Sequence, residues 1–295
     1  MRILITGSNG LLGQKLVKEC LKRGFNFIAT SKGSNRNPDC PTLHYLELDI
    51  SNVLELNQLF QFYYPTHVIH TAAITNVDYC EKNKEECDQI NIDSTRFLVK
   101  LSNQYKAHFQ FLSTDFVFDG IKGNYSEEDE VNPLSHYGKS KVEGELIVQN
   151  GNCDNWSIVR TSLVYGNGHN LSRSNIILWA LESLTSEKTI NVVDDQFRSP
   201  TFVEDLAWGC LEIIEKKEKG KFHISGPEII SVIDLVFIVA DYFELPKNKV
   251  IPIHTTHLKE SAIRPLKTGF NLMKSRNKLN YSPLTLEKTL DLLKK

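Results

Sequence analysis

The amino-terminal stretch MRILITGSNGLLGQKL (residues 1–16) indicates the fold class of this 295-residue chain. It joins a short apolar run, Arg2–Thr6, to a glycine-rich turn and then to an amphipathic segment, Leu11–Arg23. Glycine allows a tight turn, leaves bare backbone that a pyrophosphate can approach, and lets the helix lie close on the strand. The amino terminus of such a helix would offer free N–H groups to an anion. The stretch therefore predicts the start of a dinucleotide-binding βαβ unit.

The glycines of this turn are spaced GxxGxxG, one residue longer at the front than the standard dinucleotide fingerprint. Loops also collect glycine for reasons of turn geometry alone, but the placement between a strand and a helix favours binding. We expect the turn to contact a dinucleotide through Gly7, Ser8, Asn9, Gly10, Leu11, Leu12 and Gly13.

The same alternation of strand and helix continues through the first two thirds of the chain. Strands are predicted at Arg2–Thr6, Phe25–Thr30, His44–Leu48, His67–His70, His108–Leu112 and Ser157–Arg160. Helices are predicted at Leu11–Arg23, Val53–Tyr63, Lys82–Tyr105 and Leu134–Gln149. Short runs rich in Ile, Val, Leu and Phe are typical of strands buried on both faces. Connected by helices, they predict a doubly wound α/β domain of the Rossmann type with a parallel sheet.

Beyond about Gly166 the alternation becomes less regular. Further helices are expected at Ile176–Thr185, Phe202–Lys216 and Ser231–Phe243. We predict a dinucleotide-binding domain over residues 1–165 and a smaller mixed, substrate-binding region over residues 166–295, with some segments returning to the Rossmann core.

The composition excludes several classes of protein. Lys and Arg number 34 against 36 Asp and Glu, a near balance that argues against a nucleic-acid or anionic-membrane partner. The amino terminus lacks the long apolar stretch of a signal peptide. We expect free thiols in a reducing, cytoplasmic compartment and no metal site, because the cysteines form no CxxC pair. They are Cys20, Cys40, Cys80, Cys87, Cys153 and Cys210.

The end of the second predicted strand bears on the choice of cofactor. A carboxylate expected there would hold the adenosine ribose hydroxyls, but the chain continues with Ser31 and Lys32, and Arg36 follows closely. These side chains would accept a 2′-phosphate that an acidic residue would repel. NADP(H) is therefore favoured and NAD(H) stays open, as does an ordinary solvated loop.

Three polar residues are candidates for the chemistry of the site. Tyr137 and Lys141 form a YxxxK pair, which a helix would place on one face. A nearby ammonium would lower the phenol pKa toward the neutral range. Thr114 follows the fifth predicted strand, where ligands bind in open α/β sheets and where its hydroxyl could donate to a substrate oxygen. The alternatives are a surface helix pair and a hydroxyl that caps a turn.

With these motifs the chain resembles the extended short-chain dehydrogenase/reductase family and, within it, the dTDP-4-dehydrorhamnose reductases. The matching stretches are ITGSNGLLGQKL (5–16), TAAITNVDYCE (71–81), STDFVFDG (113–120), NPLSHYGKSKVEGE (132–145), RTSLVYG (160–166), VVDDQFRSPTFVEDLA (192–207) and HISGPE (223–228). The resemblance implies a seven-stranded sheet and a lid-like substrate region. It also implies Thr114, Tyr137 and Lys141 as the catalytic set, with Asn91 as a candidate fourth member of a proton relay.

The implied reaction is the NADPH-dependent reduction of a nucleotide-linked 4-keto-6-deoxy sugar, with dTDP-4-dehydro-L-rhamnose as the first candidate. Beyond the glycine turn we expect the cofactor to contact Ser31, Lys32, Asp49, Ile50, Ala72, Ala73, Thr75, Asn91, Tyr137 and Lys141. Arg173 and Arg198 are candidates for the nucleotide diphosphate, with solvated surface positions as the alternative.

Two departures from the family put the exact sugar in question. Phe116 stands where the reductases usually have tyrosine, and Leu163 where they usually have tryptophan. Other nucleotide-sugar reductases, epimerases and dehydratases, and a non-catalytic NADP-binding regulatory subunit, remain alternatives. A homodimer and a divalent ion between subunits are also left open.

Overall fold

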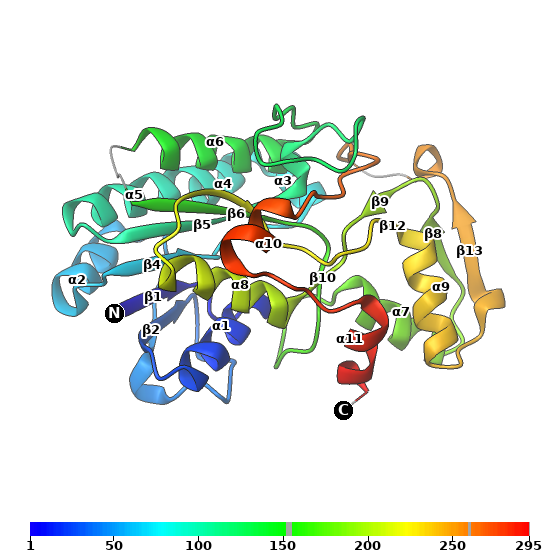
Figure 1. The fold of residues 1–295 in the computed structure, drawn as a ribbon, viewed down its shortest axis with the longest axis horizontal. Helices are drawn as coiled ribbons and strands as arrows, with labels where there is room; N and C mark the ends of the chain where they lie inside the picture. Colours follow the sequence, from blue (N-terminus) through cyan, green and yellow to red (C-terminus); the bar gives the residue numbers. More distant parts are fainter. Residues whose placement is uncertain (152–154, 259–260, 295) are drawn as a thin grey trace.

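A parallel sheet of seven strands forms the centre of the molecule (Figure 1). The computed structural model describes residues 1–151, 155–258 and 261–294. Across the sheet the strands follow the order β11-β6-β5-β4-β1-β2-β3. They are β1 (Arg2–Thr6), β2 (Asn26–Ser31), β3 (Tyr45–Glu47), β4 (His67–His70), β5 (His108–Thr114), β6 (Trp156–Thr161) and β11 (Gly220–His223). The predicted doubly wound sheet is confirmed, and its order reverses between β1 and β4, where such sheets bind ligands.

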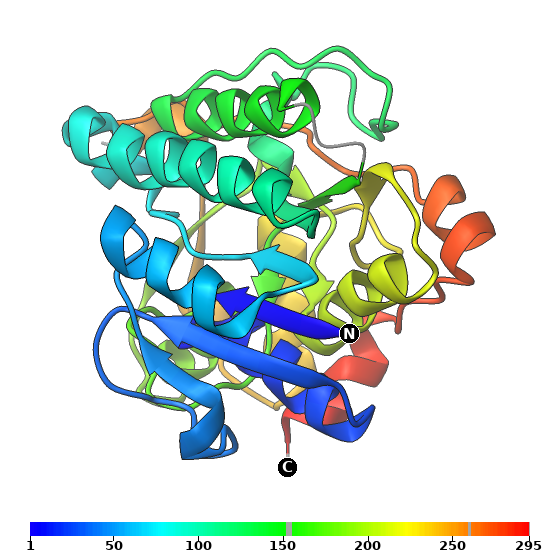
Figure 2. The same ribbon diagram turned by 90° about the vertical axis from the view of Figure 1, so that its left-hand side faces the viewer.

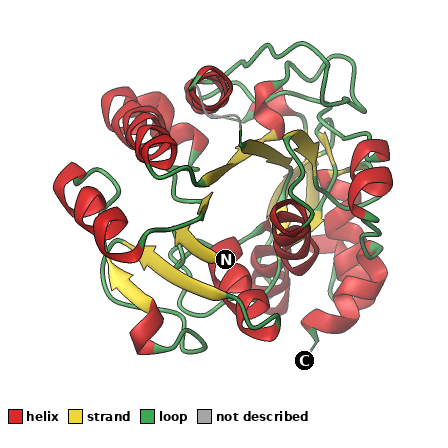
Figure 3. Ribbon diagram, turned by 60° about the vertical axis from the view of Figure 1, so that its left-hand side comes forward, coloured by secondary structure: helices red, strands yellow, loops and turns green. Residues whose placement is uncertain are grey.

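Helices cover both faces of this sheet (Figure 3). On one face lie α1 (Leu11–Lys22), α8 (Val203–Glu215) and α10 (Met273–Leu279), and on the other α2 (Val53–Tyr63), α5 (Ser94–Gln104) and α6 (His136–Asn150). Figure 2 shows α5 and α6 side by side. Strand β1 explains the two layers: Ile3 and Ile5 enter one core and Leu4 the other, because successive side chains point to opposite faces.

The long helix predicted over Lys82–Tyr105 is confirmed over residues 84–104, with a π-helical turn inside it, but a separate short helix precedes it. The chain forms α3 (Val77–Lys82), α4 (Lys84–Asp88), a π-helical turn (Gln89–Asp93) and then α5. Asn83 breaks the helix with a non-helical backbone conformation, and its side-chain amide donates to the Tyr79 carbonyl at 3.0 Å. Such side-chain bonds compete with the helical ladder. The sequence analysis also missed strand β11, which joins the edge of the sheet beside β6.

A second group of elements lies beside the carboxyl-terminal ends of the strands (Figure 1). Its helices are α7 (Ile176–Thr185), α9 (Val232–Tyr242) and α11 (Leu286–Leu293). Its strand pairs are β7 (Val164–Tyr165) with β10 (Thr201–Phe202), β8 (Ile190–Val193) with β13 (Val250–Ile253), and β9 (Phe197–Arg198) with β12 (Ile230–Ser231). Single 3-10 turns cover Thr42–His44, Asp115–Val117, Lys247–Lys249 and Thr255–His257.

The carboxyl-terminal half of the chain contributes to both groups of elements. Helix α8 packs against α1, and β11 pairs with β6, although both follow residue 166. A division into two domains at residue 165 therefore stays a prediction. None of the helices in the described ranges has the length and apolar character needed to cross a membrane.

Candidate active site

A cleft of about 1050 Å³ opens at the carboxyl-terminal ends of the strands. The switch point between β1 and β4 creates it, because the connections from these strands leave in opposite directions. Most of the residues predicted from the sequence line this cleft. They are Gly7, Gly10, Leu11, Leu12, Gly13, Ser31, Lys32, Asp49, Ile50, Ala72, Ala73, Thr75, Thr114, Tyr137 and Lys141.

The glycine turn at the floor of the cleft has no room for a side chain at Gly7 or Gly13. Gly7 has φ +74°, and a Cβ added there would lie 2.7 Å from the main-chain nitrogen of Ala72. A Cβ on Gly13 would lie 2.4 Å from the Gly7 carbonyl oxygen. Helix α1 begins at Leu11, and no side chain caps it. Its first N–H groups therefore lack intrahelical partners, and the turn fits a pyrophosphate bound against bare backbone.

Ser8 and Asn9 were predicted to contact the dinucleotide, but neither residue lines the cleft. Both side chains are buried. Asn9 instead holds the loop that follows β2: its amide nitrogen donates to the Ser34 carbonyl at 2.9 Å, and its amide oxygen accepts from the Arg36 main-chain N–H at 2.8 Å. Arg36 lines the cleft, so Asn9 acts through this loop rather than by direct contact.

The end of β2 presents an ion pair at the mouth of the cleft. Lys32 is mostly exposed, and its ammonium lies 2.9 Å from Asp49. Burial opposes the charge of Asp49, but hydrogen bonds from Lys32 and Ser51 outweigh it and hold the pKa of this carboxyl below its usual value. With Arg36 nearby, this edge of the cleft carries two basic side chains and the carboxylate of Asp49.

The structure brings the three predicted catalytic residues to one wall of the cleft. Thr114 ends β5, while Tyr137 and Lys141 lie in the first turns of α6, whose first turn is capped by the Ser135 hydroxyl. Gly138 makes their approach possible, because a Cβ there would lie 2.4 Å from the Phe116 carbonyl oxygen. Helix α6 therefore rests directly on the segment after β5. The glycine inside the YxxxK motif was a signal that the sequence analysis did not use.

The electrostatics of the pair differ from the prediction. Burial raises the pKa of Tyr137, and a hydrogen bond with the Thr114 side chain works against that rise. Burial lowers the pKa of Lys141 to about 8, and its ammonium lies 4.0 Å from the centre of the Phe111 ring. The prediction that the phenol pKa of Tyr137 lies toward the neutral range is therefore wrong for the protein alone, because burial outweighs every group that lowers it. The phenol is protonated at neutral pH.

A buried carboxylate that the sequence analysis overlooked anchors Thr114. The Thr114 hydroxyl donates to Asp115 at 3.1 Å and accepts from the Phe116 N–H at 3.2 Å. Asp115 also accepts from the hydroxyls of Ser162 and Thr268, and Arg198 lies 3.7 Å from it. Burial raises the pKa of Asp115, while Arg198 opposes that rise. Because Ser162, Arg198 and Thr268 are far from Asp115 in the sequence, no local motif could reveal the role of this carboxylate.

The two candidate arginines have different environments. Arg173 lines the cleft and donates to the Thr75 carbonyl at 3.4 Å. Arg198 is only 3% exposed, and its Nη groups donate to Gln196 and to the carbonyls of Phe197, Pro265 and Leu266. The expectation that Arg198 holds a diphosphate is therefore wrong, and so is the alternative of a solvated surface position. It is a structural arginine beneath the cleft.

Asn91 lies behind the cleft rather than on its wall. Its amide oxygen accepts from the Ile74 N–H at 2.8 Å, and its amide nitrogen donates to the Ile74 carbonyl and to the Ser140 hydroxyl, each at 3.0 Å. It therefore ties the segment after β4 to helix α6. The predicted direct contact between Asn91 and the cofactor has no counterpart in the lining of the cleft.

Another wall of the cleft combines the two departures from the family with a segment of which the sequence analysis identified only Arg173. Both departures from the family, Phe116 and Leu163, line the cleft, and the Phe116 ring meets Tyr137 edge-on with centres 6.2 Å apart. The remaining part of this wall comes from the segment before α7 and from α7 itself. Its residues are Leu171, Ser172, Arg173, Ser174, Asn175, Ile176 and Trp179.

Comparison with known proteins places the chain in a family. Residues 1–293 match the family described as the RmlD substrate binding domain. The chain is similar to a dTDP-4-dehydrorhamnose reductase from Clostridium acetobutylicum, with 32% identity, a TM-score of 0.87 and coverage of 100% of both chains. It is also similar to the dTDP-4-dehydrorhamnose reductase from Bacillus anthracis solved in complex with NADP, with 28% identity, a TM-score of 0.86 and coverage of 99% and 98%.

Among curated proteins, methionine adenosyltransferase 2 subunit beta from Bos taurus is 33% identical over 257 residues, which cover 85% of this chain and 75% of that protein. A probable low-salt glycan biosynthesis reductase from Haloferax volcanii is 29% identical over 292 residues, which cover 98% and 96%. The chain therefore belongs to the RmlD substrate-binding domain family, within the extended short-chain dehydrogenases/reductases.

Proposed function

We propose that this protein reduces the keto group of a nucleotide-linked 4-keto-6-deoxy sugar with NADPH, converting dTDP-4-dehydro-L-rhamnose to dTDP-L-rhamnose. One observation carries the proposal: Thr114, Tyr137 and Lys141 share a cleft whose floor is a turn with bare backbone at Gly7 and Gly13. A proton donor, a hydroxyl that can orient a carbonyl, and a dinucleotide cradle are the parts that such a reduction needs.

The residues of the cleft fit a dinucleotide. Gly7 and Gly13 leave bare backbone for the pyrophosphate, and the start of α1 offers N–H groups to it. Lys32 and Arg36 favour a 2′-phosphate, which supports NADP(H) over NAD(H). When bound, the reduced nicotinamide supplies the hydride. Ala72 and Ala73 leave room for the cofactor beside the glycine turn.

The three polar residues divide the remaining work. Tyr137 holds a proton on its hydroxyl at neutral pH, because burial raises its pKa, and it can give that proton to the carbonyl oxygen as charge develops there. The Thr114 hydroxyl can release its bond to Asp115, donate to the same oxygen instead and fix the direction of that oxygen. Lys141 provides a buried positive charge, which stabilises the phenolate that remains after the proton has left.

The substrate side of the cleft supports a nucleotide sugar. Arg173 is placed to pair with a diphosphate, because a guanidinium can donate two parallel hydrogen bonds to phosphate oxygens. Phe116, Leu163 and Trp179 offer apolar surface to the deoxy edge of the sugar and to the base. Phe116 lacks the hydroxyl of the tyrosine usual in the reductases, so the pocket accepts a less polar sugar edge. Leu163 is smaller than the usual tryptophan, so the pocket also accepts a bulkier one.

A regulatory subunit is the second candidate. The 33% identity to methionine adenosyltransferase 2 subunit beta favours it, since that protein is named as a subunit of another enzyme. The complete set of Thr114, Tyr137 and Lys141 in one cleft supports catalysis instead.

Cofactor oxidation with a panel of nucleotide 4-keto-6-deoxy sugars separates the two candidates. The reductase proposal expects sustained loss of reduced-nicotinamide absorbance with NADPH and one of the sugars. Tyr137→Phe should lower kcat by about 10²–10⁴-fold and leave the Kd for NADPH unchanged, since the phenol acts in the proton transfer. NADPH binding without turnover of any sugar would favour the regulatory subunit, and a fully active Tyr137→Phe would refute the role of the phenol.

A further inference from the structure

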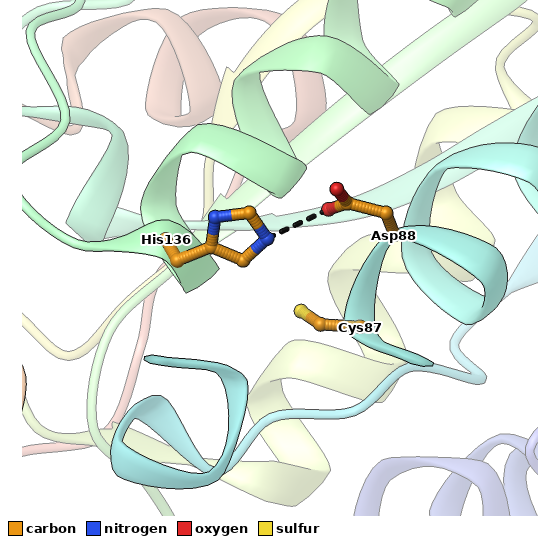
Figure 4. A group of neighbouring side chains, drawn as sticks. All are labelled: Cys87, Asp88 and His136. Atoms are coloured by element: carbon orange, nitrogen blue, oxygen red, sulfur yellow. Dashed lines mark hydrogen bonds and ion pairs between the residues drawn. The ribbon is translucent and has the colours of Figure 1, made fainter. Parts of the chain in front are cut away.

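Three side chains of metal-binding type meet behind the cleft wall, at the junction of α4 and α6 (Figure 4). Cys87 and Asp88 end α4, and His136 begins α6. The Asp88 carboxylate lies 2.8 Å from His136 Nε2. One donor atom from each of the three residues lies within 4.8 Å of the other two. Within the described ranges, none of the three lines the cofactor cleft, so this group is separate from the proposed active site.

The donor set selects a class of cation. A thiolate, an imidazole and a carboxylate are the ligands that Zn²⁺ and similar borderline-soft divalent ions use, whereas Mg²⁺ and Ca²⁺ prefer oxygen alone. With metal–ligand bonds of about 2.0–2.3 Å, tetrahedral geometry places donor atoms roughly 3.3–3.6 Å apart. The Asp88–His136 contact must open slightly and Cys87 must move closer.

The surroundings support the ligands and leave a path for the ion. The Asn91 amide nitrogen, which bonds Ile74 and Ser140, lies 3.4 Å from the Cys87 sulfur and packs against it. The Glu81 carboxylate of α3 accepts from the His136 main-chain N–H at 2.9 Å and so fixes the start of α6 beside α3. The Asp88 side chain is 42% exposed and that of His136 17% exposed, so one side of the group opens to solvent while Cys87 stays buried.

We propose that Cys87, Asp88 and His136 form a binding site for a borderline-soft divalent cation of the Zn²⁺ class, with water in the fourth position. The sequence contained no signal for it, because Cys87–Asp88 and His136 are separated by nearly fifty residues and match no metal-ligand spacing. Only the packing of α4 against α6 brings the three together. The site does not depend on the proposed reductase activity.

Titration of the full chain, without a polyhistidine tag, with Co²⁺ tests the proposal. Cobalt bound to a thiolate shows a sulfur-to-metal charge-transfer band, so the wild-type spectrum alone reports whether a cysteine is a ligand. We expect one Co²⁺ per chain with this band, and its loss when Zn²⁺ is added in equal amount. Binding of neither ion, or binding without the charge-transfer band, would overturn the proposal.

Ligand variants locate the site. Cys87→Ser and His136→Gln should each weaken binding by about tenfold or more. Two matched controls should not: His254→Gln, which alters a His–Asp pair with 3.2 Å between His254 and Asp195, and Cys40→Ser, a buried thiol elsewhere. Circular dichroism first establishes that each variant is folded, and an unfolded variant leaves the decision to the wild-type spectrum. Unchanged affinity in both folded ligand variants would refute the assignment.

Discussion

The hydroxyl of Thr114 is held by the buried carboxylate of Asp115, to which it donates at 3.1 Å. Asp115 is in turn held by Ser162, by Thr268 and by the guanidinium of Arg198 at 3.7 Å. A side chain on the cleft wall is therefore oriented by groups drawn from three separate parts of the chain. This arrangement orients Thr114 without any contact to a ligand.

The hydroxyl of Thr114 can be tested with a matched pair of variants. Thr114→Val keeps the shape but removes the hydroxyl, so kcat for keto-sugar reduction should fall by about 10²–10³-fold. Thr114→Ser keeps the hydroxyl and should retain most of the activity. Steady-state kinetics measures both. Equal rates for the two variants would show that the hydroxyl has no part in the reaction.

Substitution of Arg198 should lower the stability of the protein, whereas substitution of Arg173 should weaken binding of the nucleotide sugar. Arg198→Met leaves the Asp115 carboxylate buried without its cationic neighbour, so the free energy of unfolding should fall by about 3 kcal/mol. Arg173→Ala should change stability by less than about 0.5 kcal/mol but raise KM for the nucleotide sugar. Urea unfolding and kinetics provide the two measurements. A normal KM in Arg173→Ala would end its assignment to the diphosphate.

Lys141 predicts a specific dependence of stability on pH. Burial lowers its pKa from 10.5 to about 8, so between these values the unfolded chain binds more protons than the folded one. The free energy of unfolding contributed by this group therefore rises with pH across that window and is lowest below it. Lys141→Met should be more stable than wild type near neutral pH, by up to about 3 kcal/mol.

The comparison of the two proteins at two pH values supplies the check on Lys141. The advantage of Lys141→Met should shrink as the pH approaches the unfolded pKa, where wild-type Lys141 is neutral in both states. Urea unfolding measures the stability of both proteins at each pH. The difference between them at one pH cancels the contributions of all other titrating groups. A constant difference in stability would mean that the buried charge is not its cause.

Arg36 should decide the preference between cofactors. Because it lines the cleft beside the end of β2, Arg36→Ala should raise the Kd for NADPH about tenfold, as expected for one lost charge-assisted bond, and leave the Kd for NADH unchanged. Fluorescence titration of both nucleotides measures this. An equal loss of affinity for NADPH and NADH would indicate that Arg36 supports the loop rather than binding a 2′-phosphate.

The parts predicted correctly are those with local signals. Apolar runs of four to six residues located six of the seven strands, and the YxxxK spacing located Tyr137 and Lys141. Strand β11 was missed because the alternation that reveals βαβ units is lost before it. The short helix before Asn83 was missed because its six residues are too few to show a helical period of apolar side chains.

Roles that depend on burial could not be predicted in the same way. Arg198 has the charge of a phosphate ligand, but its place beneath the cleft makes it a partner of Asp115 and of four protein acceptors. The pKa of Tyr137 is governed by burial and Thr114, neither of which is visible in the helix that carries Tyr137.

The amino-acid order alone determined the parallel sheet, the glycine turn and the identities of the three polar residues in the cleft, since each depends on periodicity or spacing within a short segment. The tertiary structure decided which polar groups face the cleft, which lie buried behind it, and which pairs form from distant segments. The reason is physical: hydrogen bonds and charges act over a few ångströms of space, and only the packing of helices on the sheet makes those distances short.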